Sequence, residues 1–245
     1  MPQQQVTFHI VGDAYVDFFC FLSGDWPENG GDARLDQPVK LYAGGSSTNT
    51  ATHLQSLTRH FCSAADAPPK VILQTVLNPD DQYGKMLLQH AETHGFPLIN
   101  CRPKQNHSSW TGHCIAIVSG GERSFMTHQG LVELFKASDL DIENMIHTPT
   151  DIHVHVAGYF NVVGYHHGNL RDQLVRLRQG RSTQAGNYTT TVSLVTQHDA
   201  SKQWDGGLDQ VIPYLDFLIM NELEAERIFQ RGRKQQNQSD RKSVV

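Results

Sequence analysis

Short apolar runs alternate with stretches of helical periodicity along most of this chain, and this pattern limits the folds open to it. Such alternation is typical of βαβ units, whose parallel strands form a sheet covered by helices. We therefore expect an α/β fold. The predicted strands are 6–11, 70–77, 112–119, 124–128, 151–156, 190–196 and 216–220, and the predicted helices are 47–58, 81–94, 139–146, 169–178, 207–215 and 222–230.

Two regions interrupt the alternation. Residues 23–39 are rich in glycine, aspartate and proline, and residues 112–128 alternate apolar with polar side chains around Gly120-Gly121. The second pattern predicts a β-hairpin, because two-residue glycine turns join antiparallel strands. Periodicity alone places this hairpin at a sheet edge.

Two segments near the N-terminus combine to suggest a binding site. The first strand ends at Gly12-Asp13, and a second carboxylate follows at Asp17. Gly44 and Gly45 precede a predicted helix that carries Asn49 in its first turns. Glycine lets the backbone approach a ligand closely, and a helix N-terminus offers free N–H donors. Because carboxylate and amide groups pair with neighbouring hydroxyls, the segments suit a polyhydroxyl ligand.

A third segment follows the last predicted strand. Asn221, Glu222 and Glu224 occupy the start of the helix predicted there. Acidic residues in a first turn are what helix electrostatics favours, so a purely structural role is the alternative to a binding role.

Taken in order, these segments resemble the PfkB, or ribokinase-like, carbohydrate kinase family. Further similarity lies in 78–84, in Thr111-Gly112 with 120–124, and in 155–159. The resemblance implies a three-layer α/β/α fold over residues 1–229, with a mostly parallel central sheet. It also implies a small β-lid built from about 18–42 and 112–128.

The resemblance implies roles for individual residues. Asp17, Gly44, Gly45 and Asn49, with Asp13 beside them, are expected to bind the substrate. Asn221 and Glu224 are expected near the phosphates of ATP, where they organise Mg²⁺ through water. Arg123 is expected either to contact the substrate or to belong only to the lid hairpin, and a structural role is favoured. Asp81 and Gly84 are expected to form a turn and a helix cap with an indirect role.

One element of the family pattern is missing. Family members carry a G-A-G-D turn whose amides form an anion hole and whose aspartate is the catalytic base, and nothing after Glu224 matches it. No catalytic residue is identified, and the base is expected beyond residue 245. The C-terminal part of the fold is then absent, and residues 230–245 are expected to form a polar, disordered tail. We expect self-association through the lid or through an open sheet edge at 215–220.

The predicted function is ATP-dependent phosphoryl transfer to a hydroxymethyl group of a sugar or nucleoside. The chain alone is expected to be inactive, because it lacks the base and the anion hole. The alternative is a non-catalytic sugar-binding or regulatory protein on the same scaffold. A nicotinamide-dependent dehydrogenase fits the alternation, but Gly12-Asp13-Ala14-Tyr15 lacks the glycine spacing that cradles a pyrophosphate.

Composition limits the classes of partner that this chain is expected to bind. The net charge of -5 argues against nucleic acid, and no apolar stretch is long enough to span a bilayer. The four cysteines form no C-x-x-C pair, and the fourteen histidines show no three- or four-ligand spacing, so no direct metal site is expected. We expect a cytoplasmic protein whose partner is a small molecule.

Overall fold

A parallel sheet forms the centre of the molecule. The computed structural model describes residues 5–62, 68–102, 109–184 and 186–242. The sheet has six strands in the order β10-β9-β8-β1-β4-β5, and every neighbouring pair is parallel. Its strands are β1 (Val6–Gly12), β4 (Lys70–Thr75), β5 (Leu98–Asn100), β8 (Asp151–Ala157), β9 (Thr190–Val195) and β10 (Phe217–Ile219).

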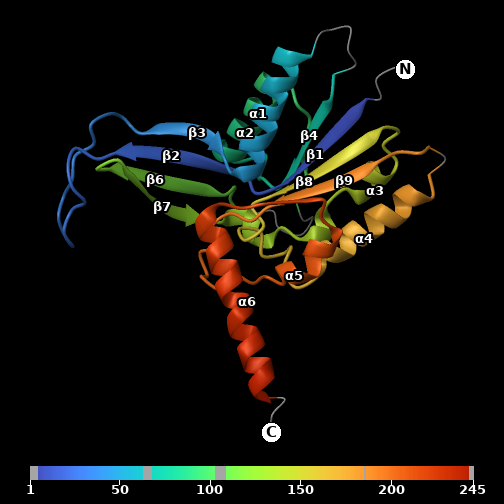
Figure 1. Ribbon diagram of the computed structural model, residues 1–245. Coiled ribbons are helices and arrows are strands. Elements are labelled where there is room, and N and C mark those ends of the chain that lie inside the picture. Colours follow the sequence, from blue (N-terminus) through green and yellow to red (C-terminus); the bar gives the residue numbers. More distant parts are fainter. Residues whose placement is uncertain (1–4, 63–67, 103–108, 185, 243–245) are drawn as a thin grey trace.

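Helices cover both faces of this sheet. Figure 1 shows α1 (Ser46–Phe61) and α2 (Gln82–His94) on one face, with α3 (Ile142–Ile146), α4 (Asn169–Ser182) and α5 (Leu208–Val211) on the other. Short 3-10 turns lie at Gly130–Leu134, Ala137–Asp139 and Ile212–Tyr214. Neighbouring side chains of β1 point to opposite faces, so Ile10 joins the core under α1 while Val11 joins the core over α4.

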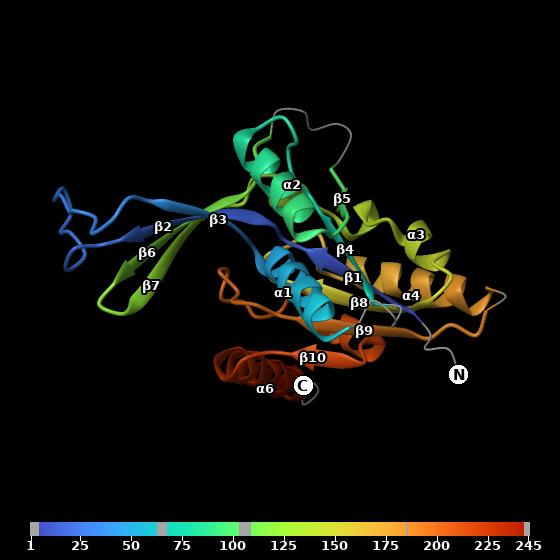
Figure 2. The ribbon, with the colours of Figure 1, turned by 90° about the horizontal axis from the view of Figure 1, so that it is seen from above.

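A second, four-stranded sheet projects from the first, and we call it the lid sheet (Figure 2). Its order is β3-β2-β6-β7, where β2 and β6 are parallel and the outer pairs are antiparallel. The strands are β2 (Tyr15–Phe21), β3 (Lys40–Gly44), β6 (His113–Ser119) and β7 (Glu122–His128). The predicted fold class, a mostly parallel sheet between helices with a small β-lid, is confirmed.

The C-terminal helix differs from the expectation. α6 runs from Glu222 to Lys242, so residues 230–242 are helical rather than a disordered tail. The segment contains no proline and a single glycine, Gly232, and is rich in glutamine, lysine and arginine, which are good helix formers. Helix propensity, rather than polarity, therefore decides the structure of this segment.

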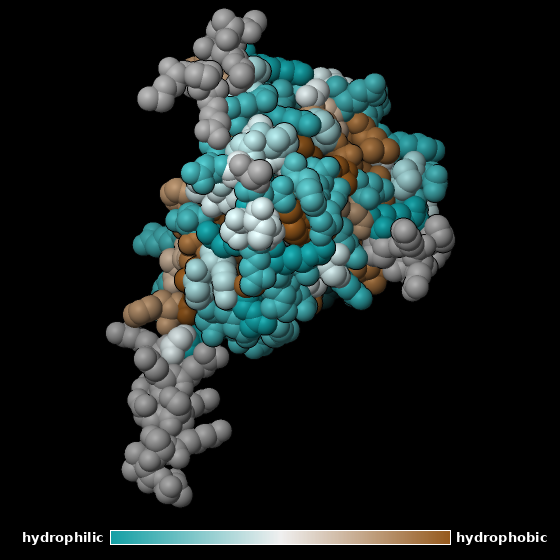
Figure 3. All heavy atoms as spheres, turned by 90° about the vertical axis from the view of Figure 1, so that its right-hand side faces the viewer, coloured by the Kyte–Doolittle hydropathy of each residue, from teal (hydrophilic) through white to brown (hydrophobic). Residues whose placement is uncertain are grey.

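The end of the molecule away from the lid sheet is mainly hydrophilic, with hydrophobic side chains showing only in patches (Figure 3). No helix within the described ranges is long and apolar enough to cross a membrane. The four cysteines are free thiols.

Candidate functional site at the carboxyl ends of the strands

The junction between the two sheets is built on Asp13. It follows β1, is 1% exposed, and its backbone carbonyl accepts hydrogen bonds from Ser47 N (3.3 Å) and Ser47 Oγ (2.6 Å) at the start of α1. Its Oδ2 accepts a hydrogen bond from Asn161 Nδ2 at 2.9 Å. Burial raises the pKa of the Asp13 carboxyl to about 6, although the Asn161 hydrogen bond opposes this. Asp13 therefore ties α1 and the turn after β8 to the end of β1.

Asp17 lies in β2, where its carboxylate packs over the backbone of Gly44. Tyr15 pairs with Gly44 in the β2–β3 ladder, and a Cβ on Gly44 would lie 2.1 Å from Asp17 Oδ2. Only glycine leaves room for the carboxylate there. Burial raises the pKa of Asp17 to about 6. Within the described ranges no side chain or amide donates a hydrogen bond to this carboxylate, so it is free to accept one from a ligand.

Gly45 connects the lid sheet to α1. It is the residue before the helix and has φ +88°, a conformation that other residues rarely adopt. A Cβ here would lie 2.7 Å from the carbonyl oxygen of Asp13. Asn49 N donates to Gly45 O at 3.0 Å, which places Asn49 in the first turn of α1 with an exposed side chain. Asp13, Asp17, Gly44, Gly45 and Asn49 thus lie on the elements that meet where β1 ends, the lid strands β2 and β3 begin or end, and α1 starts.

Asn221 and Glu224 form a reciprocal cap at the N-terminus of α6. Glu224 N donates to Asn221 Oδ1 at 2.8 Å, and Asn221 Nδ2 donates to Glu224 Oε1 at 2.8 Å. Thr196 Oγ1, at the end of β9, donates to Glu224 Oε2 at 2.6 Å. Glu224 is 6% exposed. Both oxygens of this carboxylate already accept hydrogen bonds, as expected for a capping box.

One contact that the sequence did not predict joins the start of α1 to the loop beside the α6 cap. Gln197, just after β9, donates through Nε2 to Ser46 Oγ at 3.1 Å. Thr196, beside Gln197, donates a hydrogen bond to Glu224. The residues around Asp13 and Asn49 and the cap of α6 therefore lie along one edge of the sheet. Carboxyl ends of parallel strands meet at one edge and commonly hold ligands, a rule that could have singled out both residues.

A groove opens beside this site on the α1 face of the sheet. Its volume is about 960 Å³. Its lining includes Ser46, Asn49 and Gln197, and the apolar side chains Phe217 and Ile219 of β10. These two β10 side chains are 58% and 50% exposed, so α1 leaves them largely uncovered.

Histidines in the groove form hydrogen bonds rather than a metal site. Ser193 Oγ lies 2.7 Å from both His153 Nε2 and His155 Nδ1, so the two histidines share a face of β8. Burial lowers the pKa of His155 to about 4, so it is neutral at pH 7. The described residues contain no group of three or more side chains able to hold a metal ion.

The remaining predicted residues are structural or exposed. Asp81 caps α2 by accepting from Gly84 N at 2.6 Å, and its Oδ2 accepts from Thr111 N at 2.7 Å, which confirms the expected turn and cap. Arg123 is exposed in β7 of the lid sheet.

This fold defines a class: α/β proteins in which a small β-lid projects from a central parallel sheet. A family model for the pfkB family carbohydrate kinases matches residues 9–242, and the chain belongs to that family. Adenosine kinase of Saccharomyces cerevisiae is 28% identical over 196 residues, which are 80% of this chain and 51% of the yeast protein. The chain thus spans about half the length of this relative.

Solved structures show the same fold at lower identity. Ribokinase from Giardia lamblia matches with a TM-score of 0.66 and 16% identity over 92% of this chain and 60% of its own. A carbohydrate kinase from Agrobacterium tumefaciens gives 0.63 and 16%, over 91% and 63%. Ribokinase of Arabidopsis thaliana, complexed with ribose and ATP, gives 0.57 and 16%, over 92% and 62%.

Proposed function

We propose that this chain binds the hydroxyl-bearing acceptor of an ATP-dependent phosphoryl transfer, in which a sugar or nucleoside receives phosphate on a hydroxymethyl group. The observation that supports this most is the Asp17 carboxylate, which lies over Gly44 without a protein donor among the described residues. Asn49 is exposed and lines the neighbouring groove. An acceptor and an amide so placed suit adjacent hydroxyls.

A nucleoside is the acceptor we favour. The yeast relative, at 28% identity, is an adenosine kinase, whereas the ribokinases that match by structure are only 16% identical. The groove beside Asn49 also offers apolar side chains from Leu54 and Phe217, against which a base could pack. Ribose alone would leave that apolar surface unused.

The residues proposed for the nucleotide side do not fit a magnesium site. Mg²⁺ prefers several oxygen ligands in octahedral geometry. Both oxygens of Glu224 accept hydrogen bonds within the cap of α6, and the side chain is 6% exposed. We therefore propose that ATP and Mg²⁺ need groups beyond those described, and that this chain alone transfers phosphate slowly or not at all.

Because both oxygens of Glu224 already accept hydrogen bonds, a second function is also supported, that of a non-catalytic sugar- or nucleoside-binding protein. Calorimetric titration with adenosine, ribose and fructose, followed by a phosphorylation assay with ATP and Mg²⁺, separates the two. Binding with turnover supports the kinase and overturns the proposal that this chain alone is inactive. Binding without turnover is the result we expect of this chain, and binding of none of the three overturns both candidates.

Glu224→Gln provides the matched control for that assay. It should weaken the helix cap by about 1 kcal/mol, because the amide NH2 of glutamine cannot accept one of the hydrogen bonds that the carboxylate accepts. It should leave adenosine affinity unchanged, because Glu224 is not among the residues proposed to bind the acceptor. A loss of adenosine binding in a variant with a normal melting temperature would contradict this division of roles.

A further inference from the structure

A second hollow lies between the loop after β9 and helix α6. Its volume is about 530 Å³. It shares no lining residue with the groove beside Asn49, although Gln197 of the groove and His198 of the hollow are neighbours in sequence. The lining residues are His198, Lys202, Gln203 and Trp204 from the loop, and Leu223, Arg227, Gln230 and Arg231 from α6.

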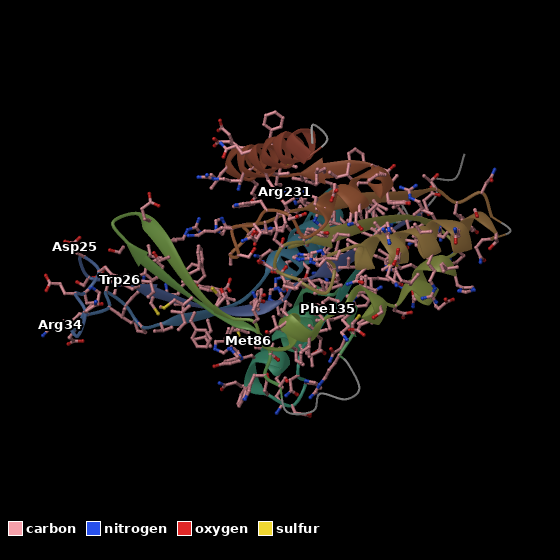
Figure 4. All side chains as sticks on the ribbon, turned by 90° about the horizontal axis from the view of Figure 1, so that it is seen from below. Asp25, Trp26, Arg34, Met86, Phe135 and Arg231 are labelled. Atoms are coloured by element: carbon pink, nitrogen blue, oxygen red, sulfur yellow. The ribbon has the colours of Figure 1, made fainter. Side chains whose placement is uncertain are left out.

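The lining of this hollow is cationic. It contains Lys202, Arg227 and Arg231 and no carboxylate. Arg231 lies between α6 and the loop (Figure 4), with Nη1 2.9 Å from Asp205 Oδ1 and 3.0 Å from the carbonyl oxygen of Trp204. Lys202 and Arg227 are exposed, and their charged groups form no ion pair within the described part of the chain. Two positive charges in a concave site therefore remain uncompensated.

The loop holds Lys202 in a strained conformation. Gln197, Lys202 and Trp204 have φ values of 63°, 59° and 54°, a region that residues other than glycine rarely adopt. Asp199 imposes this shape: its Oδ1 accepts from Ser201 N at 2.9 Å, and its Oδ2 accepts from Trp204 N at 2.5 Å. Strained backbone persists where surroundings impose it, and it clusters at ligand clamps.

We propose that this hollow binds a phosphate group, carried by orthophosphate or by a phosphate monoester, between Lys202 and Arg227. A guanidinium matches the spacing of phosphate oxygens with two parallel N–H donors, and an ammonium adds a mobile point charge. Trp204, 6% exposed, packs edge-on against His198 with ring centroids 5.2 Å apart and forms an apolar wall. The hollow is roomy enough for a small phosphorylated molecule. This site is independent of the proposed acceptor site.

Fluorescence gives a local reporter of the site. The chain has three tryptophans, so Trp26→Phe with Trp110→Phe leaves Trp204 alone. The full chain carrying these two changes is titrated at constant ionic strength with orthophosphate, ribose 5-phosphate and AMP. We expect a saturable change with at least one of the three. Ribose, adenosine and chloride should give none, and saturating adenosine should not abolish the response to AMP.

Substitutions test the assignment. Lys202→Gln and Arg227→Gln should each weaken binding about tenfold, and together about a hundredfold, because each removes a hydrogen bond to a charged group. Lys85→Gln, an exposed lysine on α2, is the matched control with the same loss of charge. Arg227→Lys should keep most of the affinity, which guards against a folding defect in the glutamine variant.

Each outcome decides the matter. A response to orthophosphate identifies the free anion as sufficient, and a response only to AMP or only to ribose 5-phosphate identifies the ester. The proposal is overturned by the absence of a saturable response at millimolar concentration, by an equal response to adenosine or ribose, or by a double variant that binds like Lys85→Gln.

Discussion

Removal of the Asp17 carboxylate should weaken acceptor binding by one to two decades. A hydrogen bond to a charged group contributes about 1.5–3 kcal/mol, and about 1.4 kcal/mol corresponds to a tenfold change in Kd. Asp17 has no donor among the described residues, so the free protein loses no compensating contact when the side chain is truncated. Titration calorimetry with adenosine or ribose on Asp17→Ala and Asp17→Asn measures the change.

The pH dependence of the same titration sharpens the test. Burial raises the pKa of Asp17 from 3.8 to about 6, so the carboxylate is mostly ionised at pH 7 and mostly protonated at pH 5. A ligand that needs the ionised form should bind roughly tenfold more weakly at pH 5 than at pH 7. Asp17→Asn cannot titrate and should lose that difference.

Asp25→Asn is the control, because Asp25 lies far out on the lid side of the molecule (Figure 4) and is exposed. It should bind as the wild type does at both pH values. The reasoning is refuted if Asp17→Ala binds the acceptor within a factor of two of the wild type. It is also refuted if Asp17→Asn keeps the full pH dependence of the wild type.

Three further predictions concern neighbouring features. Gly44→Ala should reproduce the binding loss of Asp17→Ala, because its Cβ would meet Asp17 Oδ2 at 2.1 Å and displace the carboxylate. The melting temperature should change little, because that carboxylate can rotate away. Unfolding of the variant, or an unchanged affinity, would contradict this prediction. Folding raises the pKa of Asp13 from 3.8 to about 6, so Asp13 stabilises the fold at low pH and this contribution is lost as pH rises through 6. The stability of Asp13→Asn relative to wild type should therefore rise by roughly 1.5 kcal/mol from pH 5 to pH 7.5, measured by urea titration, and a flat difference would refute the shift. Because Phe217 and Ile219 are half exposed on edge strand β10, the wild type should self-associate in sedimentation experiments and Phe217→Lys with Ile219→Lys should do so less; a monomeric wild type would contradict the prediction.

Local sequence patterns predicted the central sheet well, because each of its longer strands is a buried apolar run between loops. They missed β2, β3 and β5. β5 has three residues, too few for a pattern. β2 and β3 lie in the small lid sheet, where burial is partial and does not alternate cleanly, so the period of two is weak.

In the candidate site, too, local sequence patterns predict some contacts and miss others. The cap formed by Asn221 and Glu224 is a local N-x-x-E pattern, and a structural role was the alternative that helix electrostatics offered for these residues. The contact of Asp13 with Asn161 spans 148 positions in sequence and occurs in a turn without periodicity. No local signal predicts such a pair. Likewise, Asp17 and Gly44 were linked by the family resemblance, and the β2–β3 register supplies the physical cause.

That register couples the acceptor site to the position of the lid sheet. Asp17 and Gly44 belong to lid strands β2 and β3, whereas Asn49 belongs to α1, which is anchored to the main sheet through Ser47 and Asp13. Gly45 joins the two parts at φ +88°. A rotation at Gly45 would move the Asp17 carboxylate while Asn49 stays in place, because the lid sheet and α1 share no other covalent connection there. A ligand that holds both side chains must therefore fix the angle of the lid sheet, and the affinity contributed by Asp17 includes the free energy of that ordering.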